Sequence, residues 1–173
     1  MSKRQLNAYL KDLSKEELEE QVLDLYQRFK PVKVFYDFVF NPREEELVRK
    51  AKFKISKEYF PDTKRKAKTR RSVAQNEIKH FRQLGVEPHL TADLMLFNIE
   101  IAQTYAAEQN KLKEAFCKSM FKSYEEAVKY ITKTGIVTEF KKRLLKIADT
   151  TEKQKWPNVY RFEKTAMQFQ EMP

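Results

Sequence analysis

Glycine is nearly absent from this sequence, and that scarcity limits its possible folds more than any other feature. Only Gly85 and Gly135 occur in 173 residues. Tight hairpins and many strand connections need residues at positive φ, so β-sandwiches, barrels and Rossmann-type folds are disfavoured. A P-loop, a dinucleotide fingerprint or a nucleophile elbow cannot be built from these two glycines either. The sequence therefore favours an all-α fold and excludes the Gly-rich nucleotide sites.

The most apolar helix-length segment is Thr91–Asn110, and we expect it to lie at the centre of the fold. Its apolar residues cover a broader face than a surface helix needs. Thr91 is predicted to be its N-cap. Asn98 falls within the apolar face, and we interpret it as a structural amide bonded to a neighbouring helix; the alternative is a polar anchor in a ligand pocket. On a helical wheel, the polar residues occupy a narrow polar wedge opposite the apolar face: Asp93, Glu100, Gln103 and Thr104.

Cap patterns, prolines and both glycines predict where the other helices begin and end. Three patterns mark helix starts: Ser14 with Glu17, Asn41 with Pro42 and Glu44, and Ser123 with Glu126. Gly85 and Gly135 fall where glycines end helices. These signals predict a single all-α domain over residues 1–173, with about eight or nine short helices stacked as antiparallel hairpins around Thr91–Asn110.

The segment Val32–Phe40 is ambiguous. Its residues alternate as a strand would and have high β-propensity. No second segment offers a strand to pair with it, and a lone strand is not stable. We therefore expect either a short buried helix or an extended segment that crosses the core.

Several features bear on the compartment. Cys117 is the only cysteine, which rules out an intrachain disulfide and suits a reducing compartment. No apolar run approaches the roughly 20 residues of a membrane span, and the polar N-terminus has no signal-peptide core. We expect a cytoplasmic protein that does not contact membranes. Lys113 and Lys118 could favour a Cys117 thiolate, but a buried core thiol is the preferred interpretation.

Two resemblances concern the N-terminal part of the chain. Asn7–Leu18 and Phe40–Pro42 resemble a small family of uncharacterised bacterial proteins that is described only as a domain of unknown function. The resemblance implies a bacterial, helical, intracellular protein and no catalytic residue. The first two expected helices are also similar to the SAP DNA-binding module. That module's turn glycines are missing here, and Ser14–Glu20 is acidic where DNA contact needs basic residues.

The segment Lys64–Arg71 is the best candidate for a binding site, because it holds six basic residues and no acid. The net charge of +10 also favours acidic partners. Such cations would neutralise phosphates without reading sequence. The proposed polyanion-binding residues are Lys64, Arg65, Lys66, Lys68, Arg70, Arg71, Lys79 and Arg82. The alternatives are a solvated face or mobile link, and contact with an acidic protein.

Other candidate sites are weaker. Glu77–His80 has the Glu-x-x-His spacing of di-iron helical bundles, but no second copy exists. His89 and Asp93 could hold a cation at a helix start; nevertheless we expect no metal and no cofactor. Trp156–Arg161 mixes aromatic residues with arginine as single-strand binders do, yet core packing of Trp156 and Tyr160 is the favoured interpretation.

Three functions remain open from the sequence. The first is a non-enzymatic helical domain whose basic surface binds nucleic acid or another polyanion. The second is a helical protein-interaction or oligomerisation module that uses the apolar segments Val32–Phe40 or Val159–Phe169. The third is an enzyme without a recognisable motif, whose catalytic residues are scattered along the sequence.

Overall fold

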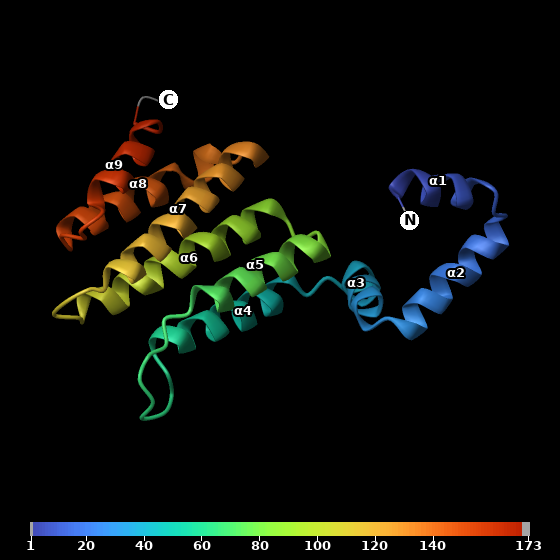
Figure 1. Cartoon of the computed structure of the whole chain (residues 1–173), viewed down its shortest axis with the longest axis horizontal. Coiled ribbons are helices and arrows are strands. Elements are labelled where there is room, and N and C mark those ends of the chain that lie inside the picture. Colours follow the sequence, from blue (N-terminus) through green and yellow to red (C-terminus); the bar gives the residue numbers. More distant parts are fainter. Residues whose placement is uncertain (1, 171–173) are drawn as a thin grey trace. The chain divides into compact units, whose positions relative to one another are not determined.

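The computed structural model describes residues 2–170, and within them it has nine helices and no strand (Figure 1). The predicted all-α class is confirmed. By its contacts the chain divides into two compact units, with the boundary between Arg43 and Glu44. Each unit is described by itself below, and the single domain over residues 1–173 stays a prediction. None of the helices in residues 2–170 is long and apolar enough to span a membrane.

The first unit contains three helices: α1 (Lys3–Lys11), α2 (Lys15–Arg28) and α3 (Lys30–Phe40). Ser14 caps α2 in a capping box with Glu17, as predicted. The side chain of Gln21 donates to the Tyr9 hydroxyl at 2.6 Å, and the Tyr26 hydroxyl donates to Asp37 at 2.9 Å. No residue of α1, α2 or α3 is buried. Polar contacts and partly covered rings therefore hold this unit together, without a closed core.

The ambiguous segment Val32–Phe40 is helical, since it forms most of α3. It is not buried, however, contrary to the sequence expectation: the Phe40 side chain is 73% exposed. A unit of about forty residues has too little chain to enclose a core. The predicted Asn41 cap is also wrong. The Asn41 N–H donates to the carbonyl of Asp37, so Asn41 ends α3, and α4 begins only at Glu44.

The second unit contains six helices, and consecutive helices contact each other as a series of hairpins. They are α4 (Glu44–Tyr59), α5 (Arg71–Leu84), α6 (Pro88–Ala107), α7 (Glu114–Thr134), α8 (Val137–Lys153) and α9 (Val159–Met167). Helix α6 contacts α4, α5, α7 and α8 (Figure 1), and half of its residues are buried. The predicted central helix is confirmed.

Details of α6 depart from the sequence interpretation. Pro88 occupies the first turn, and Thr91 lies inside the helix with no exposed surface, so Thr91 is not the N-cap. Proline suits that first turn because its missing N–H has no helical partner there. Gln103, assigned to the polar wedge, is buried and donates to the Ile147 carbonyl at 2.8 Å. Asn98 is 1% exposed and accepts a bond from Tyr59 of α4 at 3.3 Å, which confirms the predicted bond to a neighbouring helix, while its Nδ2 has no partner within residues 2–170.

The predicted C-terminal ends of α5 and α7 are confirmed, but the predicted helix start at Ser123 is wrong. Gly85 and Gly135 both end their helices at φ 74°, as predicted. Helix α7 continues through Ser123 and Glu126, so these two residues form no capping box. The same spacing inside a helix places them on one face, where both contact a single arginine described below.

The aromatic and sulfur candidates are mostly core residues. Cys117 has no exposed surface, and burial raises the pKa of its thiol, which confirms the core interpretation. Trp156 is 1% exposed as expected, whereas Tyr160 is 64% exposed and does not pack in the core. In the segment Val159–Phe169, the apolar side chains that face the core are buried: Phe162, Ala166 and Phe169. Tyr160 and Met167 of the same segment are 64% and 60% exposed, so a protein contact through Val159–Phe169 stays a prediction.

Candidate polyanion-binding site

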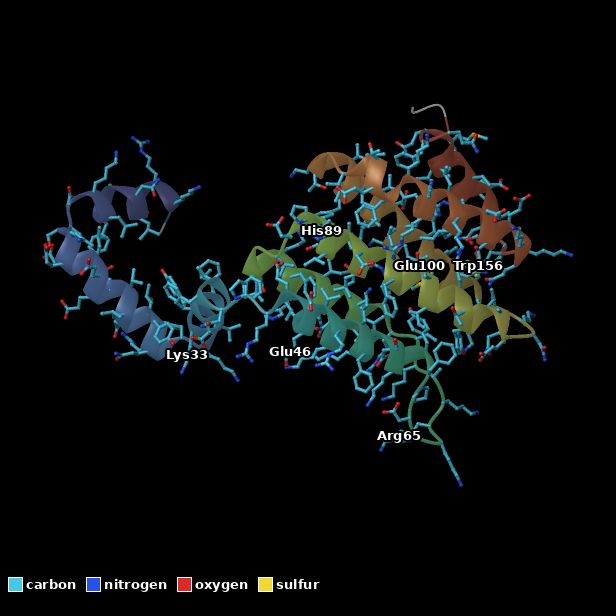
Figure 2. The ribbon with its side chains drawn as sticks, turned by 180° about the vertical axis from the view of Figure 1, so that it is seen from behind. Lys33, Glu46, Arg65, His89, Glu100 and Trp156 are labelled. Carbon is cyan, nitrogen blue, oxygen red and sulfur yellow. The ribbon has the colours of Figure 1, made fainter. Side chains whose placement is uncertain are left out.

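The predicted basic residues occupy two parts of the second unit. Five lie in the connection between α4 and α5, here called the α4–α5 loop (residues 60–70): Lys64, Arg65, Lys66, Lys68 and Arg70. The other three belong to helix α5: Arg71, Lys79 and Arg82. Figure 2 shows Arg65 on the loop, which extends past the ends of the two helices. The basic run is therefore mainly a loop, and it becomes helical only at its last residue.

Glu58, in the last turn of α4, closes the α4–α5 loop at its base. Its carbonyl accepts bonds from the backbone N–H groups of Lys68 and Thr69 at 3.1 and 3.0 Å. Its carboxylate accepts from Arg70 Nε and Nη2 at 2.9 and 2.7 Å, and from the Arg70 backbone N–H at 3.2 Å. The bond from Arg70 holds the pKa of the Glu58 carboxyl below its usual range. One glutamate thus fixes the returning end of the loop to α4.

Thr69 has a backbone conformation that is rare for its residue type. Its φ is 49°, in the left-handed region that β-branched residues avoid. Such a conformation persists where the surrounding contacts over-determine it. The neighbouring bonds to Glu58 supply those contacts, because they fix Thr69 itself and the residues on either side of it. The base of the loop has a defined conformation.

The loop cations, defined as Lys64, Arg65, Lys66 and Lys68, have exposed side chains. None of the four makes an ion pair within residues 2–170, where the Asp62 carboxylate is engaged by Lys57 at 2.5 Å. An open hollow of about 200 Å³ lies against the loop, and its lining includes Arg65, Lys66 and Lys68. These ammonium and guanidinium groups are available to an external anion. Arg65, Lys66 and Lys68 group around one hollow, which suits phosphate oxygens, and the two carboxylates in its lining, Asp62 and Glu58, are bonded to Lys57 and Arg70.

Arg71 has a different environment. Its side chain is 21% exposed and extends from the start of α5 to helix α7. There the guanidinium donates to the Ser123 hydroxyl at 3.0 Å and to the Glu126 carboxylate at 2.5 Å. Arg71 therefore joins two helices, as Arg70 joins the loop to α4. Of the four arginines in the predicted site, Arg70 and Arg71 already hold a carboxylate of the same chain.

Lys79 and Arg82 are exposed but lie apart from the loop cations. They line a separate hollow of about 290 Å³ on α5, together with Gln75, Ile78 and Gln83. The Arg82 guanidinium also lies 5.8 Å from the centre of the Tyr130 ring. The structure thus brings the loop cations together and does not place Lys79 and Arg82 around the same hollow.

One basic surface next to the loop was missed by the sequence analysis. Residues on the exposed side of α4 form what we call the α4 basic face: Arg49, Lys50, Phe53, Lys54 and Lys57. Lys57 also lines the hollow of the α4–α5 loop, so the two surfaces are continuous. The signal was present in the sequence as basic residues three or four positions apart around a phenylalanine. The stretch Arg49–Lys57 holds five basic residues and no acid, so the criterion that selected Lys64–Arg71 also applies to it.

A second polar cluster lies between α4, α6 and α8. Arg143 donates to Asp93 at 2.7 Å and forms a pair of bonds with Glu100 at 2.8 and 2.9 Å (Figure 2 labels Glu100). Lys52 contacts the same Asp93 carboxylate at 2.6 Å. Burial by itself raises the pKa of Asp93, but the bonds from Lys52 and Arg143 outweigh it and hold that pKa below its usual range.

The hollow beside this cluster does not resemble an acid–base site. It has a volume of about 500 Å³, and its only carboxylate is Glu100, which is bonded to Arg143. General acid–base catalysis commonly uses a titratable group tuned near the working pH and free to exchange a proton. Asp93, which the cations hold ionised, is bonded to Arg143 and Lys52 instead of facing this hollow. The cluster is therefore best explained as a link between helices.

The predicted metal candidates have other partners. Asp93 is bonded to Lys52 and Arg143, which leaves His89 without the carboxylate that the sequence offered it. Glu77, paired in the sequence with His80, instead accepts a bond from Lys54 at 2.9 Å. No group of three His, Cys, Asp or Glu side chains within residues 2–170 is arranged to hold a metal ion.

Comparison with known proteins gives one match. The model of a family of unknown function, DUF6155, matches residues 1–170. No curated protein and no solved structure matches the chain. The match covers both structural units and names no activity, ligand or partner.

Proposed function

This chain belongs to DUF6155, a family of unknown function, and we propose that it is a non-enzymatic helical domain that binds nucleic acid through its α4–α5 loop. The observation that carries the proposal is the contrast within the basic run. Arg70 and Arg71 hold carboxylates of the chain, whereas the loop cations make no ion pair within residues 2–170. Because the base of the loop is already fixed, binding a ligand through its four exposed cations costs little additional conformational entropy.

Physical chemistry favours phosphates as the ligand. Exposed lysines and arginines on a loop form no base-reading surface, but each can neutralise a phosphate and release its counterions. The net charge of +10 raises the encounter rate with any polyanion. Binding should therefore be salt-dependent and largely independent of sequence.

The test replaces the loop cations with glutamine in one quadruple variant. Binding of short labelled DNA and RNA, single-stranded and duplex, is measured by fluorescence anisotropy across a salt titration. We expect the variant to lose at least roughly tenfold in affinity at low salt. The slope of log K against log salt should fall by up to about 3 on single strands, because each lost phosphate contact removes about 0.7.

A matched control variant separates the contribution of the loop to affinity from that of the overall net charge. Four exposed lysines on α7 and α8 are replaced with glutamine: Lys122, Lys129, Lys133 and Lys142. Both variants lose the same net charge, so equal losses of affinity would mean diffuse attraction and would contradict a loop site. Absence of binding by the unaltered protein at low salt would also overturn the proposal. An acidic protein would then become the partner to examine.

The first unit supports a second candidate function, self-association. Helix α3 exposes several large apolar side chains while burying none: Phe35, Val39 and Phe40 are 39%, 49% and 73% exposed. Apolar surface gathered on one helix marks contact sites, and a unit without buried residues gains stability from a second copy. We propose that α3 forms this contact.

Sedimentation at several protein concentrations tests self-association. We expect the apparent mass to rise with concentration, and a triple serine variant at Phe35, Val39 and Phe40 to remain monomeric. Serine at Tyr160, an exposed aromatic residue of α9, serves as the control and should not change the mass. A strictly monomeric unaltered protein at all concentrations would refute this second function.

A further inference from the structure

Phe53 is an exposed aromatic side chain in the middle of the α4 basic face. The ring is 56% exposed, although its helix buries Ala51, Ile55 and Tyr59 against the rest of the second unit. Phe53 therefore contributes little to the core. A large ring in this position keeps substantial apolar surface in water, which costs free energy unless a ligand covers it.

Basic side chains surround the ring on its own helix. Arg49 and Lys57 lie one turn before and after Phe53, and Lys50 lies three positions before it on the same side of α4. Lys54, the next residue in the chain, pairs with Glu77 of α5. The Lys57 ammonium is 4.2 Å from the centre of the Phe53 ring. Two more of these cations are paired with carboxylates of the chain: Lys50 with Glu46 and Lys57 with Asp62. The lysine side chains in these three pairs remain largely exposed, so the pairs are weak and a phosphate can compete for the same ammonium groups. The surroundings of Phe53 favour a ligand that has both flat apolar groups and negative charges.

The ring is also continuous with the proposed phosphate site. Lys57, which contacts Phe53, is bonded to Asp62 of the α4–α5 loop at 2.5 Å. It lines the same hollow as Arg65 and Lys66. A strand whose phosphates meet the loop cations can therefore continue along α4 and reach Phe53.

We infer that the nucleic acid bound by this chain is single-stranded, with one base stacked on Phe53 while neighbouring phosphates contact the α4–α5 loop. The inference rests on the proposed function, since the loop supplies the phosphate contacts. Bases of a duplex are stacked inside the helix, where a ring on a convex helix surface cannot reach their faces. Unpaired bases are free to stack on aromatic side chains, and basic grooves with such rings bind single strands without sequence preference.

The test compares Phe53→Leu with the unaltered protein on four probes of equal length. The probes are oligo-dT, oligo-U, an abasic DNA strand and a DNA duplex. We expect Phe53→Leu to weaken binding of oligo-dT and oligo-U roughly tenfold, the effect of losing one stacked base. Binding of the abasic strand and the duplex should not change, because these ligands offer phosphates but no free base. The ratio of oligo-dT to oligo-U affinity shows whether DNA or RNA is preferred.

Two further variants make the outcome decisive. Phe53→Tyr keeps a ring and should retain the affinity for oligo-dT, while Tyr160→Leu removes an exposed ring on α9 and should leave all four affinities unchanged. The inference is overturned if Phe53→Leu binds oligo-dT as tightly as the unaltered protein, or loses abasic binding equally. If only the quadruple loop variant loses binding, the proposed function stands and the stacking inference fails. If the loop variant binds all probes normally, both fail.

Discussion

Two groups of cations in the second unit have the same charge but different surroundings. The loop cations lie in the α4–α5 loop, residues 60–70, and make no ion pair within residues 2–170. Arg70, Arg71 and Arg143 each hold a carboxylate from another part of the unit: Glu58, Glu126, and Asp93 with Glu100. A count of basic residues in the sequence treats both groups alike, yet only the first group is free to bind a ligand.

The difference follows from where carboxylates lie in three dimensions. An arginine beside a helix can pair with an acid from a neighbouring helix and gain two hydrogen bonds in a fixed geometry. A lysine on an extended loop has no such neighbour and remains hydrated. The embedded arginines should therefore contribute to the free energy of unfolding, and the loop cations should contribute to affinity for polyanions. The two predictions below test the stability half of this comparison.

The largest expected effect on stability is that of Arg143→Met. Methionine keeps much of the apolar stem but leaves Asp93 and Glu100 without the guanidinium that bonds both of them. Breaking a fully buried ion pair costs several kcal/mol. Since the Arg143 side chain is 31% exposed, we expect a smaller loss of about 2 kcal/mol in the free energy of unfolding, measured by urea denaturation.

The matched control for this prediction is Arg65→Met, which removes an arginine from the loop. It should change the free energy of unfolding by less than about 0.5 kcal/mol, as for most exposed positions. Equal losses in the two variants would show that the loop also supports the fold. The separation of the cations into binding and structural groups would then be wrong.

Local signals in the sequence predicted the fold well, whereas the site depended on contacts between distant residues. The Ser14 cap and the two glycine helix ends were correct because each is decided within one helical turn. The prediction of a capping box at Ser123 and Glu126 was wrong. The same spacing inside α7 places both side chains on one face, where they bind Arg71, which lies 52 residues from Ser123 in the chain. Nothing local distinguishes a cap from a tertiary partner.

The candidate site stays a prediction, and for the same reason the sequence located only part of its basic surface. A basic run without acidic residues identified the α4–α5 loop. The pairing of Arg70 with Glu58 could not be predicted, because it forms only where the loop returns to α4. The α4 basic face was missed although Arg49–Lys57 holds five basic residues and no acid. Phe53 lies off the buried stripe of α4 formed by Ala51, Ile55 and Tyr59, so helical periodicity alone places it on the exposed side.

The smallest expected effect is a loss of stability at acid pH. Bonds from Lys52 and Arg143 keep the pKa of Asp93 below its usual range despite burial, and Arg70 lowers the pKa of Glu58. A carboxyl group whose pKa is lower in the folded state stabilises the fold above its unfolded pKa, about 4, and this contribution is lost as the pH falls through the folded pKa. Stability should therefore decline below about pH 4.

Urea denaturation of three proteins between neutral pH and the acid range would measure this decline. Asp93→Asn should be less stable at neutral pH and should show a shallower decline, because one of the carboxylates that must take up a proton is gone. The quadruple loop variant should stay close to the curve of the unaltered protein, since its cations form no ion pair within residues 2–170 and the charge of Lys68 is the smallest of the causes that lower the pKa of Glu58. The opposite result would be a shallower decline in the loop variant and an unchanged decline in Asp93→Asn. It would mean that the loop cations, and not the embedded arginines, hold the acidic groups of this unit ionised.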